Sequence, residues 1–221
     1  MFRSALTGPL LAAAVLAGGC SGAVGTLDDL STKTYMSLRY SATVRQALDF
    51  TCGSAALATI LTHYWGRPTT EFEILQILRD RYPDGKIWKQ RTQDGFSFDD
   101  IAFVALVLGY ESAGAKIPVS ELKGLNGPVI VHLDKGKFQH FSVLRRVHEG
   151  VYYMADPTVG QIGMEKDQFE TQYTGNAMAV WMADRKLPAS APLMGVRDGL
   201  SLYSAFGKLH RDVEVPRVTT F

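Results

Sequence analysis

The sequence predicts an α+β domain whose N-terminal helices pack on a C-terminal antiparallel sheet. Helix-type apolar runs with capping signals occupy residues 52–108, and short β-type runs separated by turns follow from Tyr110 onward. The chain shows no regular alternation of strands and helices, which a parallel sheet would require. Its length of 221 residues, with 46% hydrophobic residues, suffices for one domain with a proper core.

The first two helices follow from apolar runs and their boundaries. The run that begins at Cys52 predicts a buried helix to about residue 65, where Gly-Arg-Pro at 66–68 ends the pattern. Thr70 and Glu73 have the Thr-x-x-Glu form of a capping box. They precede the apolar residues of a second helix, which are Ile74, Leu75, Ile77 and Leu78.

A third helix is expected over residues 101–108. Residues 97–100 (Ser-Phe-Asp-Asp) supply its cap, and Gly109 suits the left-handed position that follows a helix. Between the second and third helices, residues 86–95 are polar, charged and without periodicity. We expect a surface loop there that borders a cleft.

The sheet is predicted from four β-type runs, at residues 128–133, 141–147, 151–155 and 177–181. If residues 148–150 form a three-residue hairpin loop, Val147 faces Val151 and paired residue numbers sum to about 298. His140 then lies diagonal to Asp156 on the same face of the sheet. A two-residue loop would place these two side chains on opposite faces.

The N-terminal segment has the order of a secretory signal. Residues 1–20 combine an early arginine with a run of Leu, Ala and Val that is too short for a membrane span of roughly 20 residues. The sequence before Cys20 resembles the lipobox of bacterial lipoproteins, in which that cysteine is lipidated, although Ala17 departs from the pattern. Ordinary cleavage between residues 17 and 23 is the alternative. We therefore expect a periplasmic protein, either soluble or lipid-anchored.

The remaining boundaries follow from composition. Residues 21–39 read as a leader or linker, residues 40–184 as the folded domain, and residues 185–221 as a tail that opens with a Pro- and Ala-rich linker. The chain has 23 basic and 22 acidic residues without a basic cluster, which disfavours nucleic-acid binding. No metal-ligand spacing, phosphate-binding glycine loop or dinucleotide motif is present, so no cofactor is implied.

Cys52 is the candidate nucleophile. At the first turn of a helix, a cysteine feels unpaired backbone N–H groups and the positive end of the helix dipole, both of which favour the thiolate. Gln46 lies six residues earlier on the segment that leads in, where its amide can donate to an oxyanion. The simpler interpretation of Cys52 is a small core residue.

Five histidines compete for the role of base. His63 lies eleven residues after Cys52, about 16 Å along the same helix, which is out of reach. The positions of three others argue against them: His132 lies inside an apolar strand, His148 in a turn and His210 in the tail. His140 remains, and Asp156 can orient its imidazole as the third member of a triad. Alternatively, Asp156 begins an Asp-Pro turn.

These residues lie in three blocks that resemble the C39 family of cysteine peptidases, which have a papain-like fold and remove leader peptides from bacteriocin precursors. The blocks are Gln46 to Leu57, His140 to Leu144, and Ala155 to Gly160, the last followed by Phe169 and Gly175. The resemblance implies that Cys52 is the nucleophile, His140 the base and acid, Asp156 its orienting partner and Gln46 the oxyanion donor. It also implies a peptide or protein substrate.

Many members of the family precede an ABC exporter and cut after a Gly-Gly leader. This sequence has no transporter segment and carries its own export signal, so we expect a stand-alone peptidase that acts after secretion, with a secretion or surface-assembly system as partner. Two other functions stay open at this stage. One is a transglutaminase-like acyltransferase that uses the same triad, and the other is a non-catalytic module that binds a peptide.

Overall fold

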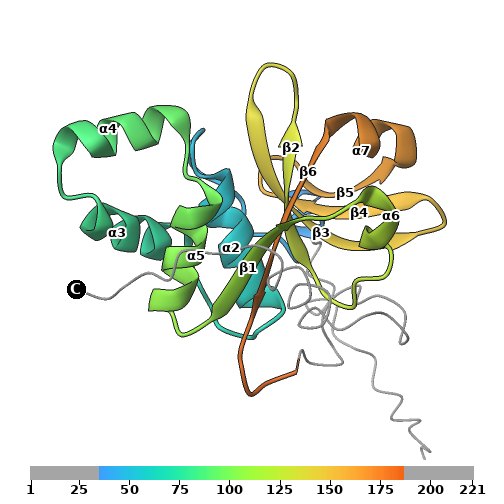
Figure 1. Ribbon diagram of the computed structural model, residues 1–221, viewed down its shortest axis with the longest axis horizontal. Helices are drawn as coiled ribbons and strands as arrows, with labels where there is room; N and C mark the ends of the chain where they lie inside the picture. The colour runs from blue at the N-terminus through green and yellow to red at the C-terminus, as the bar shows by residue number, and fades with distance from the viewer. Residues whose placement is uncertain (1–34, 187–221) are drawn as a thin grey trace, which may run out of the picture. The chain divides into compact units, whose positions relative to one another are not determined.

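The computed structural model describes residues 35–186, which form helices packed against an antiparallel sheet (Figure 1). The predicted signal segment with Cys20, most of the predicted leader and the tail from residue 187 lie outside these residues. The fold class predicted from the sequence is confirmed. No helix in residues 35–186 has the length and apolar character needed to cross a bilayer.

The three predicted helices are present as α2 (Cys52–His63), α3 (Glu71–Arg81) and α5 (Phe98–Val107). The side chain of Thr70 accepts a hydrogen bond from the Glu73 backbone N–H at the start of α3. A full capping box between Ser97 and Asp100 begins α5. Helix α2 is buried from Gly53 to Leu61 because it packs between these helices and the sheet.

The loop expected at residues 86–95 is instead helix α4 (Gly85–Asp94), so that prediction is wrong. Asp84 caps this helix by accepting hydrogen bonds from two backbone N–H groups of its first turn. The helix has no fully buried residue, and its half-buried face consists of Trp88, Arg91 and Thr92, of which only Trp88 is apolar, so the face does not show as an apolar pattern in the sequence. It is held at its edge by Trp88, whose ring lies 5.8 Å from that of Phe96 and 5.2 Å from the guanidinium carbon of Arg79.

The sheet has six antiparallel strands in the order β1-β6-β2-β3-β4-β5. The four predicted strands are its central ones: β6 (Tyr173–Trp181), β2 (Val129–Asp134), β3 (Gln139–His148) and β4 (Val151–Asp156). The sequence analysis missed the two edge strands, β1 (Glu111–Lys116) and β5 (Gly160–Glu165). Both contain glycine and few β-branched residues, so their β signal is weak.

Three short helices complete the described residues, α1 (Tyr35–Arg39), α6 (Val119–Leu122) and α7 (Lys166–Gln172). Helices α2 to α5 gather on one side of the sheet, and α6 and α7 lie on the other (Figure 1). Two apolar clusters form accordingly. One surrounds α2, and the other joins α6 and α7 to the opposite face of the sheet.

The β3–β4 hairpin has the predicted pairing near His140, but its loop length differs from the prediction. Its loop has two residues, Glu149 and Gly150, both with positive φ (51° and 79°), and His148 faces Val151. The expected three-residue loop is therefore wrong. A bulge at Arg145 then shifts the register by one residue, so that Val143 faces Ala155 as the predicted sum of 298 requires. Because of this bulge, His140 and Asp156 again share a face.

Candidate active site

Cys52 is the first residue of α2, and the structure leaves it half-buried with a free thiol. No side chain caps this helix end, because the hydroxyl of Thr51 is turned back to the Leu48 backbone. Gly53 allows α2 to approach β3 closely: a Cβ there would lie 2.9 Å from Ile101 Cδ1 and 3.2 Å from Phe141 Cδ2. The close approach brings Cys52 to the start of β3, where His140 lies.

His140 and Asp156 are in direct contact. Nε2 of His140 lies 2.9 Å from Oδ2 of Asp156, and the two side chains are only 3% and 1% exposed. Because Nε2 faces the carboxylate, Nδ1 is the ring nitrogen left for the sulfur of Cys52. The thiol of Cys52 and the imidazole of His140 lie close enough for each to shift the pKa of the other.

Asp156 is fixed by further donors that the sequence analysis did not identify. Its Oδ1 accepts hydrogen bonds from the backbone N–H groups of Thr158 (2.8 Å) and Val159 (3.3 Å). Its Oδ2 also accepts one from Nζ of Lys135 at 3.3 Å. A carboxylate with this many donors holds both its charge and its orientation. The Asp-Pro turn, offered above as an alternative role, is therefore part of the same arrangement.

The three titratable groups shift one another's pKa values in the directions that favour an ion pair. Burial raises the pKa of Cys52, but interactions of the thiolate with the His140 side chain and with the backbone at Phe141 and Gly53 outweigh it, so the thiol pKa falls below its ordinary value. Burial lowers the pKa of His140, but Asp156 and Cys52 raise it overall. Burial opposes ionisation of Asp156, yet the contact with His140 brings its pKa down to about 2.

Gln46 lines the same cavity as Cys52 and His140. Its Nε2 donates to the Leu48 carbonyl at 3.1 Å, and its Oε1 accepts from the hydroxyl of Thr158 at 3.2 Å. These two bonds fix the orientation of the amide. They use Oε1 and one of the two N–H groups of Nε2. The structure thus brings all four predicted site residues into one region.

The cavity is an open cleft of about 910 Å³. It is bounded by the C-terminal part of α4 with the turn that follows it, and by the β2–β3 hairpin. In Figure 1, α4 lies at the upper left and the β2–β3 hairpin at the top. The expectation that residues 86–95 border a cleft holds for residues 91–95, although they belong to a helix and its cap. Most of the lining side chains are polar, and the apolar ones are mainly five phenylalanines, Phe50, Phe96, Phe98, Phe138 and Phe141.

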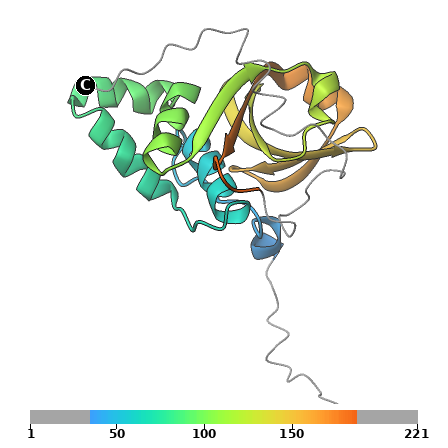
Figure 2. The ribbon, with the colours of Figure 1, turned by 60° about the horizontal axis from the view of Figure 1, so that its bottom comes forward.

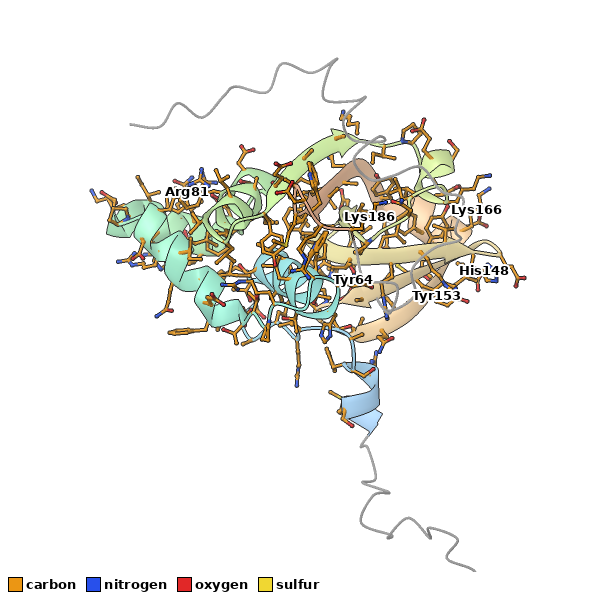
Figure 3. The ribbon with its side chains drawn as sticks, turned by 90° about the horizontal axis from the view of Figure 1, so that it is seen from below. Tyr64, Arg81, His148, Tyr153, Lys166 and Lys186 are labelled. Carbon is orange, nitrogen blue, oxygen red and sulfur yellow. The ribbon has the colours of Figure 1, made fainter. Side chains whose placement is uncertain are left out.

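His132 lies in β2, as expected, and it also lines the cleft. The hydroxyl of Thr174 donates to the His132 carbonyl, so it accepts from Nδ1 of the ring at 3.0 Å. His132 is thus satisfied at Nδ1. His63 lies half-buried near Arg145, and His148 lies at the far end of β3 from His140 (Figure 3). Neither reaches the cleft.

Helices packed on an antiparallel sheet, with a cysteine at a helix N-terminus facing a strand histidine, define the papain-like fold. The sequence matches the Peptidase C39 family over residues 41–185. The chain belongs to this family.

Three known proteins illustrate the relationship. The chain is 34% identical over 142 residues to "Probable functional amyloid protease FapD" of Pseudomonas aeruginosa, covering 64% of this chain and 61% of that protein. It is 29% identical over 130 residues to "Colicin V secretion/processing ATP-binding protein CvaB" of Escherichia coli, covering 59% of this chain and 16% of that one. The solved peptidase domain of Streptococcus ComA, a bi-functional ABC transporter, is similar with a TM-score of 0.54 and 26% identity, covering 64% of this chain and 98% of that domain.

Proposed function

We propose that this protein is an exported cysteine peptidase that cleaves a secreted peptide or protein. The observation that carries the proposal is the continuous chain of contacts from Cys52 through His140 to Asp156, with Asp156 fixed by three further donors. Such a chain is what a thiol nucleophile, its base and an orienting carboxylate require. Membership of a peptidase family supports the same reaction class.

In this mechanism, His140 takes the proton of Cys52 and the thiolate attacks the carbonyl carbon of the scissile peptide bond. The oxygen of that carbonyl becomes an oxyanion, stabilised by the Gln46 amide and the backbone N–H of Cys52. The imidazolium of His140 then protonates the leaving amine, and an acyl-enzyme remains. Water, deprotonated by His140, attacks this thioester, and release of the acid restores the thiol.

The substrate and the setting are proposed from the relatives. FapD is described as a functional amyloid protease, and CvaB as a secretion and processing protein. Together with the signal-like residues 1–20, these descriptions favour a protease that serves a secretion or surface-assembly system on the outer side of the membrane. Cys20 would be its lipid-anchoring residue if the lipobox is functional.

A direct test incubates the full-length protein with the exported proteins of its own organism and follows the products by mass spectrometry. Hydrolysis gives two fragments that together contain one added water, and Cys52→Ala gives none. Products joined to an amine would instead assign acyl transfer. A wild-type protein that binds these polypeptides but leaves them intact, with a thiol inert to an electrophilic peptide probe, would assign a binding module and overturn the proposal.

A further inference from the structure

Residues 39–46, here called the strap, run along residues 156–161, here called the Asp-Pro loop. Nε of Arg39 donates to the Val159 carbonyl, and the hydroxyl of Tyr40 donates to the Thr158 carbonyl. Figure 2 shows α1, which ends at Arg39, below the sheet in dark blue. Three further bonds link the segments, from Gln161 Nε2 to Ser41 Oγ (2.7 Å), from Gln46 N to the Pro157 carbonyl (3.0 Å) and from the Thr158 hydroxyl to Gln46 Oε1 (3.2 Å).

Gly160 makes the approach of the two segments possible. Its φ is +84°, and a Cβ at this position would lie 2.5 Å from the carbonyl oxygen of Arg39 and 2.7 Å from its Cγ. No side chain fits in that space. The strap therefore depends on a glycine in the Asp-Pro loop as well as on hydrogen bonds.

Two of the three carbonyls that the strap binds, those of Thr158 and Val159, belong to the residues that hold the carboxylate of the site. The backbone N–H groups of Thr158 and Val159 donate to Oδ1 of Asp156, while their carbonyls accept from Tyr40 and Arg39. Each of these residues is thus fixed on both sides. A shift of the strap would turn both N–H groups away from Asp156.

We propose that Tyr40 and Arg39 are positioning residues of the active site, which act through the Asp-Pro loop to hold Asp156 against His140. The inference rests on the proposed function in its assignment of Asp156, but it concerns the state of the Cys52 thiol and can be measured without a substrate. The charged group beside Asp156 is Lys135, and His132 interacts electrostatically with His140. Both are retained in every variant below.

The test measures the rate at which iodoacetamide alkylates Cys52 as a function of pH. The full-length chain is used, and mass spectrometry of the Cys52 peptide separates its signal from that of Cys20. Tyr40→Phe removes only the hydroxyl. We expect the apparent thiol pKa to rise by about one unit, which lowers the rate about tenfold at pH values below that pKa. Tyr153→Phe, on β4 near the β3–β4 turn (Figure 3), is the matched control and leaves the profile unchanged.

Two further variants separate positioning from a general loss of stability. Gly160→Ala forces the strap away and should raise the thiol pKa, whereas Gly66→Ala has the same type of backbone strain (φ +68°) in open space and should not. In an Asp156→Asn background, Tyr40→Phe should add no further shift, because both changes act through the same carboxylate. An unchanged pH profile in folded Tyr40→Phe, or a full additional shift in the Asp156→Asn background, would overturn the inference. The alkylation of Cys52 can be measured even if the protein has no peptidase activity. A failure of the proposed function can therefore be distinguished from a failure of this inference.

Discussion

The carboxylate of Glu71 binds the backbone N–H of Ala47 with both oxygens, at 3.1 and 3.0 Å. Glu71 is the first residue of α3 and is buried, while Ala47 directly follows Gln46. This anchor, together with the bond from Gln46 N to the Pro157 carbonyl, fixes the backbone of the proposed oxyanion donor from both sides.

We therefore expect Glu71→Ala to lower kcat, because Gln46 loses one of its two backbone anchors. A hydrogen bond to a charged group contributes about 1.5–3 kcal/mol, which corresponds to a loss of roughly 10- to 150-fold if it acts entirely on the transition state. Glu71→Gln keeps one acceptor and should recover most of this. Glu73→Ala is the matched control on the same helical turn, since Glu73 pairs with Arg67 away from the cleft. Equal losses in the two alanine variants would contradict the anchor role.

Gln46→Ala should lower kcat by about 10²- to 10³-fold, the usual effect of removing one oxyanion donor. The Gln46 amide touches the Asp-Pro loop only through the side-chain hydroxyl of Thr158, whereas the Thr158 backbone N–H is what holds Asp156, so alkylation of Cys52 by iodoacetamide should keep its wild-type pH profile. The two measurements together assign the loss to the oxyanion. Turnover equal to that of the wild type would remove Gln46 from the mechanism.

The pH dependence of kcat/KM should be a broad bell. The thiol pKa lies below its ordinary 9.0, so the thiolate persists to lower pH, and the imidazolium pKa lies above its ordinary 6.5, so that ion persists to higher pH. These opposite shifts favour the thiolate–imidazolium pair over the neutral pair, and the two limbs of the bell belong to the pair of groups. Asp156→Asn should narrow the bell, because Asp156 supplies the largest contribution that raises the imidazolium pKa. A bell of unchanged width would argue against the role of Asp156.

Asp156 should also contribute to acid stability. Its pKa in the folded protein is about 2, against 3.8 for the free group. A lowered pKa stabilises the fold above the unfolded value, and the contribution of about 2 kcal/mol disappears as the pH falls from 3.8 through about 2. Urea unfolding should therefore separate the wild type from Asp156→Asn at pH 5 and bring their midpoints together near pH 2. A constant difference at both pH values would contradict this linkage.

Gly53→Ala should reduce both stability and turnover. The added methyl meets Ile101 Cδ1 and the Phe141 ring, and overpacking of this kind costs about 1–3 kcal/mol, partly offset by the better helix propensity of alanine, about 1 kcal/mol. Because Phe141 follows His140, its displacement should disturb the base. Ile101→Val removes the nearer contact, so the double variant should recover part of the unfolding free energy. No recovery would indicate that the Phe141 contact dominates.

The sequence predicts the central strands of the sheet better than its edge strands and the exposed helix α4. The strands β6, β2, β3 and β4 are flanked on both sides by partners and carry strong β-type runs, whereas the edge strands β1 and β5 are glycine-containing and were missed. The sequence predicts a loop in place of helix α4 because the half-buried face of this helix is mostly polar, and the helix is held by Trp88 and by its Asp84 cap. Tertiary contacts decide such elements, and local patterns do not record them.

The four candidate site residues could be predicted because each stands in a short, specific block. The groups that support them could not. Lys135 reaches Asp156 from the β2–β3 hairpin, and Glu71 reaches Ala47 from the next helix, and both contacts depend on packing between distant segments. The sequence predicts that His140 and Asp156 share a face of the sheet, on the basis of a three-residue loop. The loop has two residues, and the bulge at Arg145 shifts the register by one residue, so the two side chains still share a face.

That bulge has a purpose of its own, because it turns Arg145 into the interior, where it donates to the Tyr64 hydroxyl at 2.9 Å and to Gln161 at 2.5 Å. The two-residue turn and the bulge consequently form a compensating pair. Deleting Arg145 while the two-residue turn keeps its pairing would move His140 to the opposite face of the sheet and separate imidazole from carboxylate. A deletion at the bulge is thus compatible with this site only where the length of the turn changes with it.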